Sequence, residues 1–277
     1  MSGWTDAPDP EWYLTPEGLA ATMDLIPGKE PPDINEEIRA GLISRQVGIA
    51  SFPHKTCSSS SAACNKSQRR SECQDTGNEY SAKYLPQTIE KWKANDDVMS
   101  AATNLINEIS AMPYFMRLAT HPDNQDFVVL QFKRTLAAAD AMDRAPAVEV
   151  AMNLQFLSTL LVVQGASGIP EEDKAALIPR LRAWKRKFPG VLAGETAERC
   201  LAVLTGQGYL APMIPMARGH MLKGVQTCAA EGCSRDSGSD GGPLQRCAKC
   251  KSTVYCSQQH QKSNWSQHKP RCFKVEY

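Results

Sequence analysis

The sequence predicts an all-α N-terminal domain, arranged as a helical bundle or an armadillo-like stack, followed by a small cysteine-rich module. Apolar residues recur at intervals of three and four from Pro86 to about Gly224, which is the period of a helix face, and few runs alternate with the period of two expected of strands. Six of the ten cysteines lie within the last 50 residues. The chain is therefore predicted to consist of two unlike parts.

Residues 1–85 are predicted to form an N-terminal arm, short helices and a loop. The tripeptide Thr15–Glu17 marks a helix start, because Thr caps helices, Pro fits the first helical turn and an acid complements the helix dipole. A second short helix is predicted over residues 33–43. Residues 55–79 are rich in Ser and almost free of large apolar side chains, so they are predicted to be a mobile loop or linker.

Residues 86–224 are predicted to form the helical domain. The apolar positions of residues 98–109 fall on one helix face. Pro146 and Gly165 bound a strongly apolar helix that is expected to be buried on most sides. The helix that follows ends in the basic residues 185–187, where the negative end of the helix dipole favours cations.

The composition is that of a globular protein, with 42% apolar and 22% charged residues. The net charge is +1, which does not indicate a nucleic-acid or membrane surface for the whole molecule. The longest apolar stretch, Leu154–Val163, is about half of the ~20 residues that a membrane span needs, so no transmembrane helix is predicted. Without a recognisable secretory signal, we expect an intracellular location in cytoplasm or nucleus, where disulfides are rare.

The cysteine-rich module contains eight residues of the types that bind Zn²⁺. Structural zinc is bound by four Cys or His ligands, so eight ligands make two sites. They are arranged in four successive pairs with short spacing, which lets both members of a pair reach one ion. The pairs are Cys228 and Cys233, Cys247 and Cys250, Cys256 and His260, and His268 and Cys272.

This arrangement, over residues 228–272, resembles the MYND-type zinc finger. The order of ligands agrees, as do the Tyr before the fifth ligand, the Gln after the sixth and the Trp three residues before the seventh. Two features depart from the family pattern: four residues rather than two separate Cys228 from Cys233, and the sixth ligand is His260 rather than Cys. Both departures retain competent zinc ligands.

The resemblance implies a cross-braced topology. In that topology the first and third pairs share one zinc ion, and the second and fourth pairs share the other. Ligand chemistry alone allows a sequential pairing equally well. Because all eight positions are filled by protein side chains, we expect structural rather than catalytic zinc. The module has few large apolar residues, so zinc binding is expected to provide its folding free energy.

The resemblance also implies a function, namely an adaptor whose finger binds protein or proline-containing peptide ligands, with transcriptional regulation as a candidate process. In such a role Gln261 would offer amide hydrogen bonds and Trp265 an apolar platform, as in the family motif; alternatively, Trp265 forms the small core of the finger. No catalytic residues are predicted, and we expect no enzyme.

Two other classes of function remain as alternatives. Residues 228–277 carry a net charge of +4, against −3 for residues 1–227, so the basic finger could belong to a nucleic-acid-binding regulator. MYND fingers also accompany SET-type methyltransferases, so the finger could be an accessory module of an enzyme, although the residues before it lack the expected active-site motifs.

Overall fold

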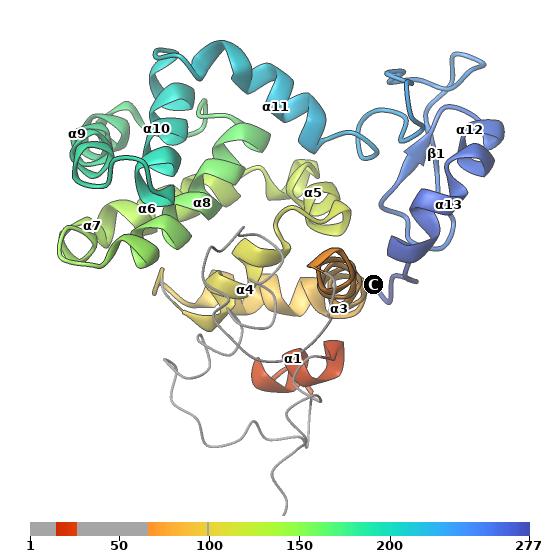
Figure 1. Cartoon of the computed structure of the whole chain (residues 1–277), viewed down its shortest axis with the longest axis horizontal. Helices are drawn as coiled ribbons and strands as arrows, with labels where there is room; N and C mark the ends of the chain where they lie inside the picture. Colours follow the sequence, from red (N-terminus) through yellow and green to blue (C-terminus); the bar gives the residue numbers. More distant parts are fainter. Residues whose placement is uncertain (1–14, 27–65, 99) are drawn as a thin grey trace, which may run out of the picture.

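The computed structural model describes residues 15–26, 66–98 and 100–277. A helical domain lies beside a small C-terminal lobe, and α11 (Ile214–Met221) leads from one toward the other (Figure 1). Over the described residues the strands are confined to the lobe, where β1 (Gln245–Arg246) pairs antiparallel with β2 (Val254–Tyr255). The predicted fold class, an all-α domain followed by a small module, is confirmed.

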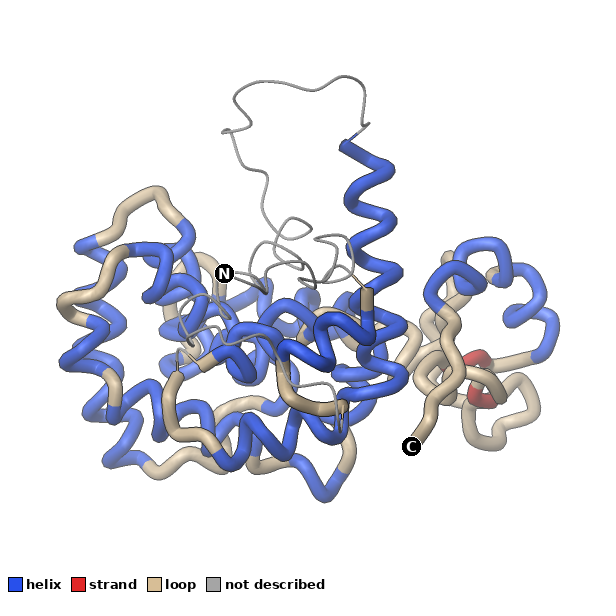
Figure 2. Tube along the Cα trace, turned by 90° about the horizontal axis from the view of Figure 1, so that it is seen from below, coloured by secondary structure: helices blue, strands red, loops and turns tan. Residues whose placement is uncertain are grey.

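The tube drawing shows how thoroughly helices dominate the larger domain (Figure 2). The other helices are α1 (Pro16–Thr22), α3 (Lys66–Ala94), α4 (Ala101–Ile109), α5 (Pro113–Ala119), η3 (Pro122–Asn124), α6 (Phe127–Ala137), α7 (Ala139–Met142), α8 (Ala147–Gln164), α9 (Glu171–Lys187), α10 (Leu192–Thr205), η4 (Ala211–Met213), α12 (Gln258–Ser263), α13 (Trp265–His268) and η5 (Lys269–Arg271).

Helix α1 begins where the sequence predicts. The hydroxyl of Thr15 accepts the backbone N–H of Gly18 at 3.0 Å, which satisfies one of the unpaired donors of the first turn. Leu19 joins the main core, and the helix packs against α3. The helix predicted over residues 33–43 lies outside the described residues.

Helix α8 is the centre of the helical domain. It contacts α4, α5, α6, α10 and α11, so the helices form a bundle around it. Pro146 and Gly165 cap it, as predicted, and Gly165 takes a φ of +80° that favours glycine. By length and composition α8 could span a membrane, but 61% of it is buried inside the protein, as befits a core helix.

Helix α3 corrects the loop predicted over residues 55–79. The helix begins at Lys66, so residues 66–79 are helical; residues 55–65 lie outside the described part of the chain. Among the serines of this segment are strong helix formers, namely Lys, Arg, Gln and Glu, whose propensity the prediction underweighted. Farther along α3, buried side chains recur at helical spacing from Tyr80 to Trp92, and packing of this face stabilises the helix.

Pro86 lies inside α3, although the sequence predicts that the helical domain begins there. Proline has no backbone N–H, so the carbonyl of Ala82 loses its usual partner within the helix. The backbone N–H of Glu276 donates to this carbonyl at 3.1 Å instead. The next residue, Tyr277, donates its hydroxyl to the carbonyl of Ser81 at 3.1 Å. The proline therefore opens α3 at the place where the segment after the lobe binds.

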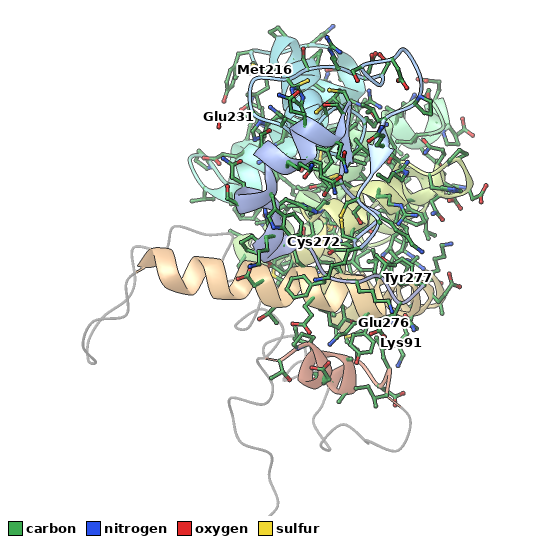
Figure 3. All side chains as sticks on the ribbon, turned by 90° about the vertical axis from the view of Figure 1, so that its right-hand side faces the viewer. Lys91, Met216, Glu231, Cys272, Glu276 and Tyr277 are labelled. Atoms are coloured by element: carbon green, nitrogen blue, oxygen red, sulfur yellow. The ribbon has the colours of Figure 1, made fainter. Side chains whose placement is uncertain are left out.

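The segment 273–277 fastens the lobe to the helical domain, with Glu276 and Tyr277 beside α3 (Figure 3). The hydroxyl of Tyr114 on α5 accepts the backbone N–H of Phe273 at 2.8 Å. It lies 3.0 Å from the carbonyl of Arg271 and 3.1 Å from that of Phe273, to which it can donate. A single hydroxyl thus holds the last turn of the lobe.

We predict that Tyr114→Phe lowers the stability of the whole chain. The substitution keeps the ring and leaves the N–H of Phe273 without its partner, which costs about 1–3 kcal/mol. Differential scanning calorimetry should show a lower Tm than for the parent protein. The matched control is Tyr209→Phe, because Tyr209 is exposed; an equal loss in both variants contradicts this role of Tyr114.

Candidate metal centres

The first cluster of metal-ligating side chains connects the first loop of the lobe with its helical end. Cys228 and Cys233 come from the loop. Cys256 follows β2, and His260 lies in α12. The Nδ1 atom of His260 is 3.2 Å from the Sγ of Cys256 and 3.5 Å from the Sγ of Cys228. The Sγ atoms of Cys233 and Cys256 are 3.9 Å apart.

The second cluster lies between the β-hairpin and the last helical turn of the lobe. Cys247 and Cys250 come from the turn after β1, His268 ends α13 and Cys272 follows η5. The Sγ atoms of Cys247 and Cys272 are 3.7 Å apart. The Sγ of Cys250 is 3.7 Å from Nε2 of His268.

Both clusters have the dimensions of a tetrahedral zinc site. Zn–S bonds of about 2.3 Å and Zn–N bonds of about 2.0 Å place two sulfurs about 3.8 Å apart, and a sulfur and a nitrogen about 3.5 Å apart. The ligand atoms of each cluster lie within 4.8 Å of one another, and the individual distances match these edges. A disulfide would instead bring two sulfurs to about 2.05 Å. The donor set of three thiols and one imidazole therefore fits zinc.

The ligand pairs alternate between the two clusters, first with third and second with fourth, so the geometry is cross-braced rather than sequential. The comparison with protein families finds the same element, since the family model "MYND finger" matches residues 228–272. These residues form a MYND finger. The comparison with curated proteins found no match, and neither did the comparison with solved structures. The two clusters fit the two zinc ions of such a finger.

A left-handed turn in the MYND finger brings Cys247 and Cys250 together. Lys251 has a φ of +53°, and its backbone N–H donates to the carbonyl of Cys247 at 2.9 Å. The N–H of Cys247 in turn donates to the carbonyl of Thr253 at 2.9 Å, which continues the hairpin ladder. The hairpin and its left-handed turn therefore set the two thiols side by side.

A helix cap positions the third ligand pair. The hydroxyl of Ser257 accepts the backbone N–H of His260 at 3.2 Å and starts α12 directly after Cys256. Because α12 begins there, Cys256 and His260 are one helical turn apart and converge on the same ion.

The two zinc sites differ in how deeply they are buried. In the first site Cys233 and His260 are partly exposed, whereas all four ligands of the second site are buried. Three second-site ligands, Cys247, Cys250 and Cys272, belong to the main hydrophobic core together with the helices. Figure 3 shows Cys272 where the finger approaches α3. The second site is therefore part of the contact between the finger and the helical domain.

Without metal, the buried thiols of the second site resist ionisation. Burial raises the pKa of Cys272 to about 12 and also raises the pKa of Cys250. Burial acts in the same direction on Cys247, but the backbone N–H groups of Cys250 and Lys249 lower its pKa overall. Burial lowers the pKa of His268, which keeps the imidazole neutral and ready to bind metal. Zinc must therefore displace protons from the thiols as it binds.

The two residues expected to contact a peptide lie one helical turn apart. Gln261, in α12, is half-buried, and Trp265, the first residue of α13, is 41% exposed. The Trp265 ring leans on that of His268, with centroids 5.8 Å apart. Tyr255, rather than Trp265, fills the interior of the finger, and its hydroxyl donates to Asn264 at 3.1 Å.

The remaining cysteines of the described chain lie outside these clusters. Cys200 is fully buried in the helical core, where it packs as a small apolar residue, and burial raises its pKa to about 12. Cys57 and Cys64 lie outside the described residues, and Cys73 falls within α3. Within the described ranges, the groups that could hold a metal are the two clusters of the finger.

Sequence reasoning missed the residues that join the finger to the helices. Tyr114 and the segment 273–277 carry no motif, and a run of five residues is too short to show a period. The available signal was Pro86, since a proline within a helical pattern leaves a carbonyl that needs another donor.

We predict that purified protein contains two zinc ions, and that the two sites affect the helical domain differently. Cys250→Ser should remove zinc from the buried site and lower the Tm of the helical domain. Cys233→Ser should remove zinc from the outer site and leave that Tm nearly unchanged. Metal analysis and circular dichroism at 222 nm measure the two effects. Equal Tm values for both variants would contradict the shared core.

We also predict that zinc affinity falls as the pH falls. At neutral pH the thiols of Cys250 and Cys272 are protonated in the metal-free finger, because both have a raised pKa. Each thiolate formed on binding releases a proton, so the logarithm of the zinc affinity should rise by at least about two per pH unit at this site. Competition with a chelator between pH 6 and pH 8 measures the slope, and a flat profile refutes it.

Proposed function

We propose that this protein is an adaptor that binds proline-containing peptides of partner proteins through its MYND finger. MYND fingers are zinc-binding protein-interaction modules and are not catalytic. The observation that carries the proposal is the exposed face of Trp265 beside Gln261, on a finger whose interior is already filled by Tyr255. An indole that is not needed inside the finger is available to a ligand.

The chemistry of this surface suits an extended proline-rich segment. Such a segment is already ordered before it binds, so it loses little conformational entropy, and its rings pack on aromatic side chains. The amide of Gln261 can donate to a peptide carbonyl and accept a peptide N–H. Asn264, between the two, is buried and accepts from Tyr255, so the turn that spaces Gln261 and Trp265 is held rigidly.

Both zinc sites support a binding role rather than catalysis. A catalytic zinc keeps one position open for water or substrate, whereas each cluster here offers four protein ligands. The helices of the finger are six and four residues long, too short to lie along a major groove as a recognition helix does. These features favour a protein ligand over the enzyme and nucleic-acid alternatives.

We predict that Trp265→Ala abolishes peptide binding and that Lys262→Ala changes it little. The tryptophan contributes about 2–4 kcal/mol if it is the anchor of the interface, whereas an exposed lysine at the rim contributes less than about 1 kcal/mol. Fluorescence anisotropy should be measured with labelled ten-residue peptides that contain two prolines, and with matched Pro→Ala peptides. The parent protein should prefer the proline peptides.

Two controls make this result interpretable. Trp265→Ala must keep two zinc ions and the parent Tm, so that lost binding reports a lost contact. A salt titration separates the alternatives, because phosphate contacts give a steep logarithmic dependence on salt and an apolar groove does not. If the variant folds normally and binds every peptide as the parent does, the proposed surface is wrong.

A further inference from the structure

Exposed apolar side chains gather between residues 209 and 216, before the first residue of the MYND finger. Tyr209 is 70% exposed, Met213 47% and Met216 67%. Single exposed apolar side chains are common on protein surfaces. What distinguishes this segment is the groove beside it, which Met213 lines. Figure 3 shows Met216 at the edge of the molecule opposite α1.

Helix α11, which carries Met216, rests loosely on the helical domain. None of its residues is buried, although it contacts α8. Arg218 ties it down, since its Nε donates to the carbonyl of Val163 at 3.1 Å. Ile214, Ala217 and Met221 are half-buried against the domain, whereas Met216 remains exposed, so part of the apolar surface of α11 is free for another protein.

A groove of about 300 Å³ lies beneath α11, between α8 and α10. Its lining is mostly apolar. The apolar residues that line it are Val162, Leu210, Met213, Ile214, Ala217 and Met221. The hydroxyls of Ser158 and Thr159 both donate to the carbonyl of Gln155, so their donors are already used.

Arg199 is the charged group of this groove. Its side chain is half-buried and forms neither an ion pair nor a hydrogen bond with any residue in the described ranges. A guanidinium that is partly withdrawn from water is stabilised by a carboxylate, with which it can form two parallel hydrogen bonds. The groove therefore combines apolar walls with a site for one acidic side chain.

We propose that this groove, which we call the α11 groove, binds an amphipathic segment of a partner protein that carries an Asp or Glu among apolar residues. The carboxylate pairs with Arg199, and the apolar side chains pack on Met213 and its neighbours. Methionine suits this role because its flexible, polarisable side chain adapts to the shape of the ligand. Arg, Met and Tyr are also the residue types that protein interfaces favour.

The shape of the site favours a protein segment over a lipid surface. A membrane surface is met by side chains that project from a convex face, whereas here the unpaired guanidinium and the side chain of Met213 line a hollow between helices. A single side-chain carboxylate, flanked by apolar groups on the same segment, matches that hollow in both charge and polarity.

A charge exchange tests the proposal in the full, zinc-loaded chain. The probes are labelled 16-residue helical peptides with Leu at positions i, i+3 and i+7 and one central Glu, paired with peptides in which that Glu is Lys. The parent protein should bind the Glu peptide at least about tenfold more tightly than the Lys peptide, as measured by fluorescence anisotropy. Arg199→Glu should reverse this preference.

Matched variants locate the binding. Arg186→Glu makes the same charge change on α9, outside the groove, and should leave the preference unchanged. Met213→Gln removes an exposed apolar contact without disturbing the core, and should lower the affinity for the Glu peptide about tenfold. Trp265→Ala, in the finger, should have no effect, which separates this site from the peptide surface of the finger.

Several outcomes overturn the proposal. It fails if no Glu peptide of the set binds, if Glu and Lys peptides bind alike, or if Arg199→Glu keeps the parent preference. It also fails if Met213→Gln binds as the parent does. Binding to phosphatidylserine vesicles in preference to every peptide assigns the surface to membranes, and dimerisation that Met213→Gln abolishes assigns it to a second copy of the chain.

Discussion

The ligation of the buried zinc ion is the interaction on which the arrangement of this protein depends. Three of its four ligands lie in the same hydrophobic core as the central helices. Directly after the last ligand, the N–H of Phe273 donates to the hydroxyl of Tyr114. Farther on, the N–H of Glu276 donates to the carbonyl in α3 that Pro86 leaves without a partner. Metal binding, folding of the finger and docking of the finger on the helices are therefore steps of one process. The outer zinc ion shapes the finger without this connection.

The ligand positions and much of the helical domain follow from the sequence because their causes are local. A short spacing between ligands constrains a few bonds, and the caps at Thr15, Pro146 and Gly165 act within one turn. The start of α3 could not be found in this way, since the composition of residues 55–79 favoured a loop. Helix propensity favours a helix there, and the same helix packs farther along, from Tyr80 to Trp92.

The contact between the two parts of the chain was also beyond sequence reasoning. The hydroxyl of Tyr114 bonds to backbone groups more than 150 residues away, and nothing in the local sequence distinguishes it from other tyrosines. The exposure of Trp265 could not be predicted from the sequence either. The position of Trp265 agrees with the family motif, but whether Tyr255 or Trp265 fills the interior depends on how the hairpin and the short helices fold together.

The finger is held at both ends, by Leu222 and Val225 in the main core on entry and by residues 273–277 on exit. This double attachment affects the thermodynamics of recognition. A module on a flexible linker must lose its freedom of orientation when a ligand spans it and its neighbour, and that loss weakens binding. Here this freedom of orientation is already lost when the chain folds, because the N–H of Glu276 donates to the carbonyl of Ala82, which Pro86 leaves without a partner. A ligand long enough to touch both parts meets a preorganised surface, and no affinity is lost to fixing the finger relative to the helices.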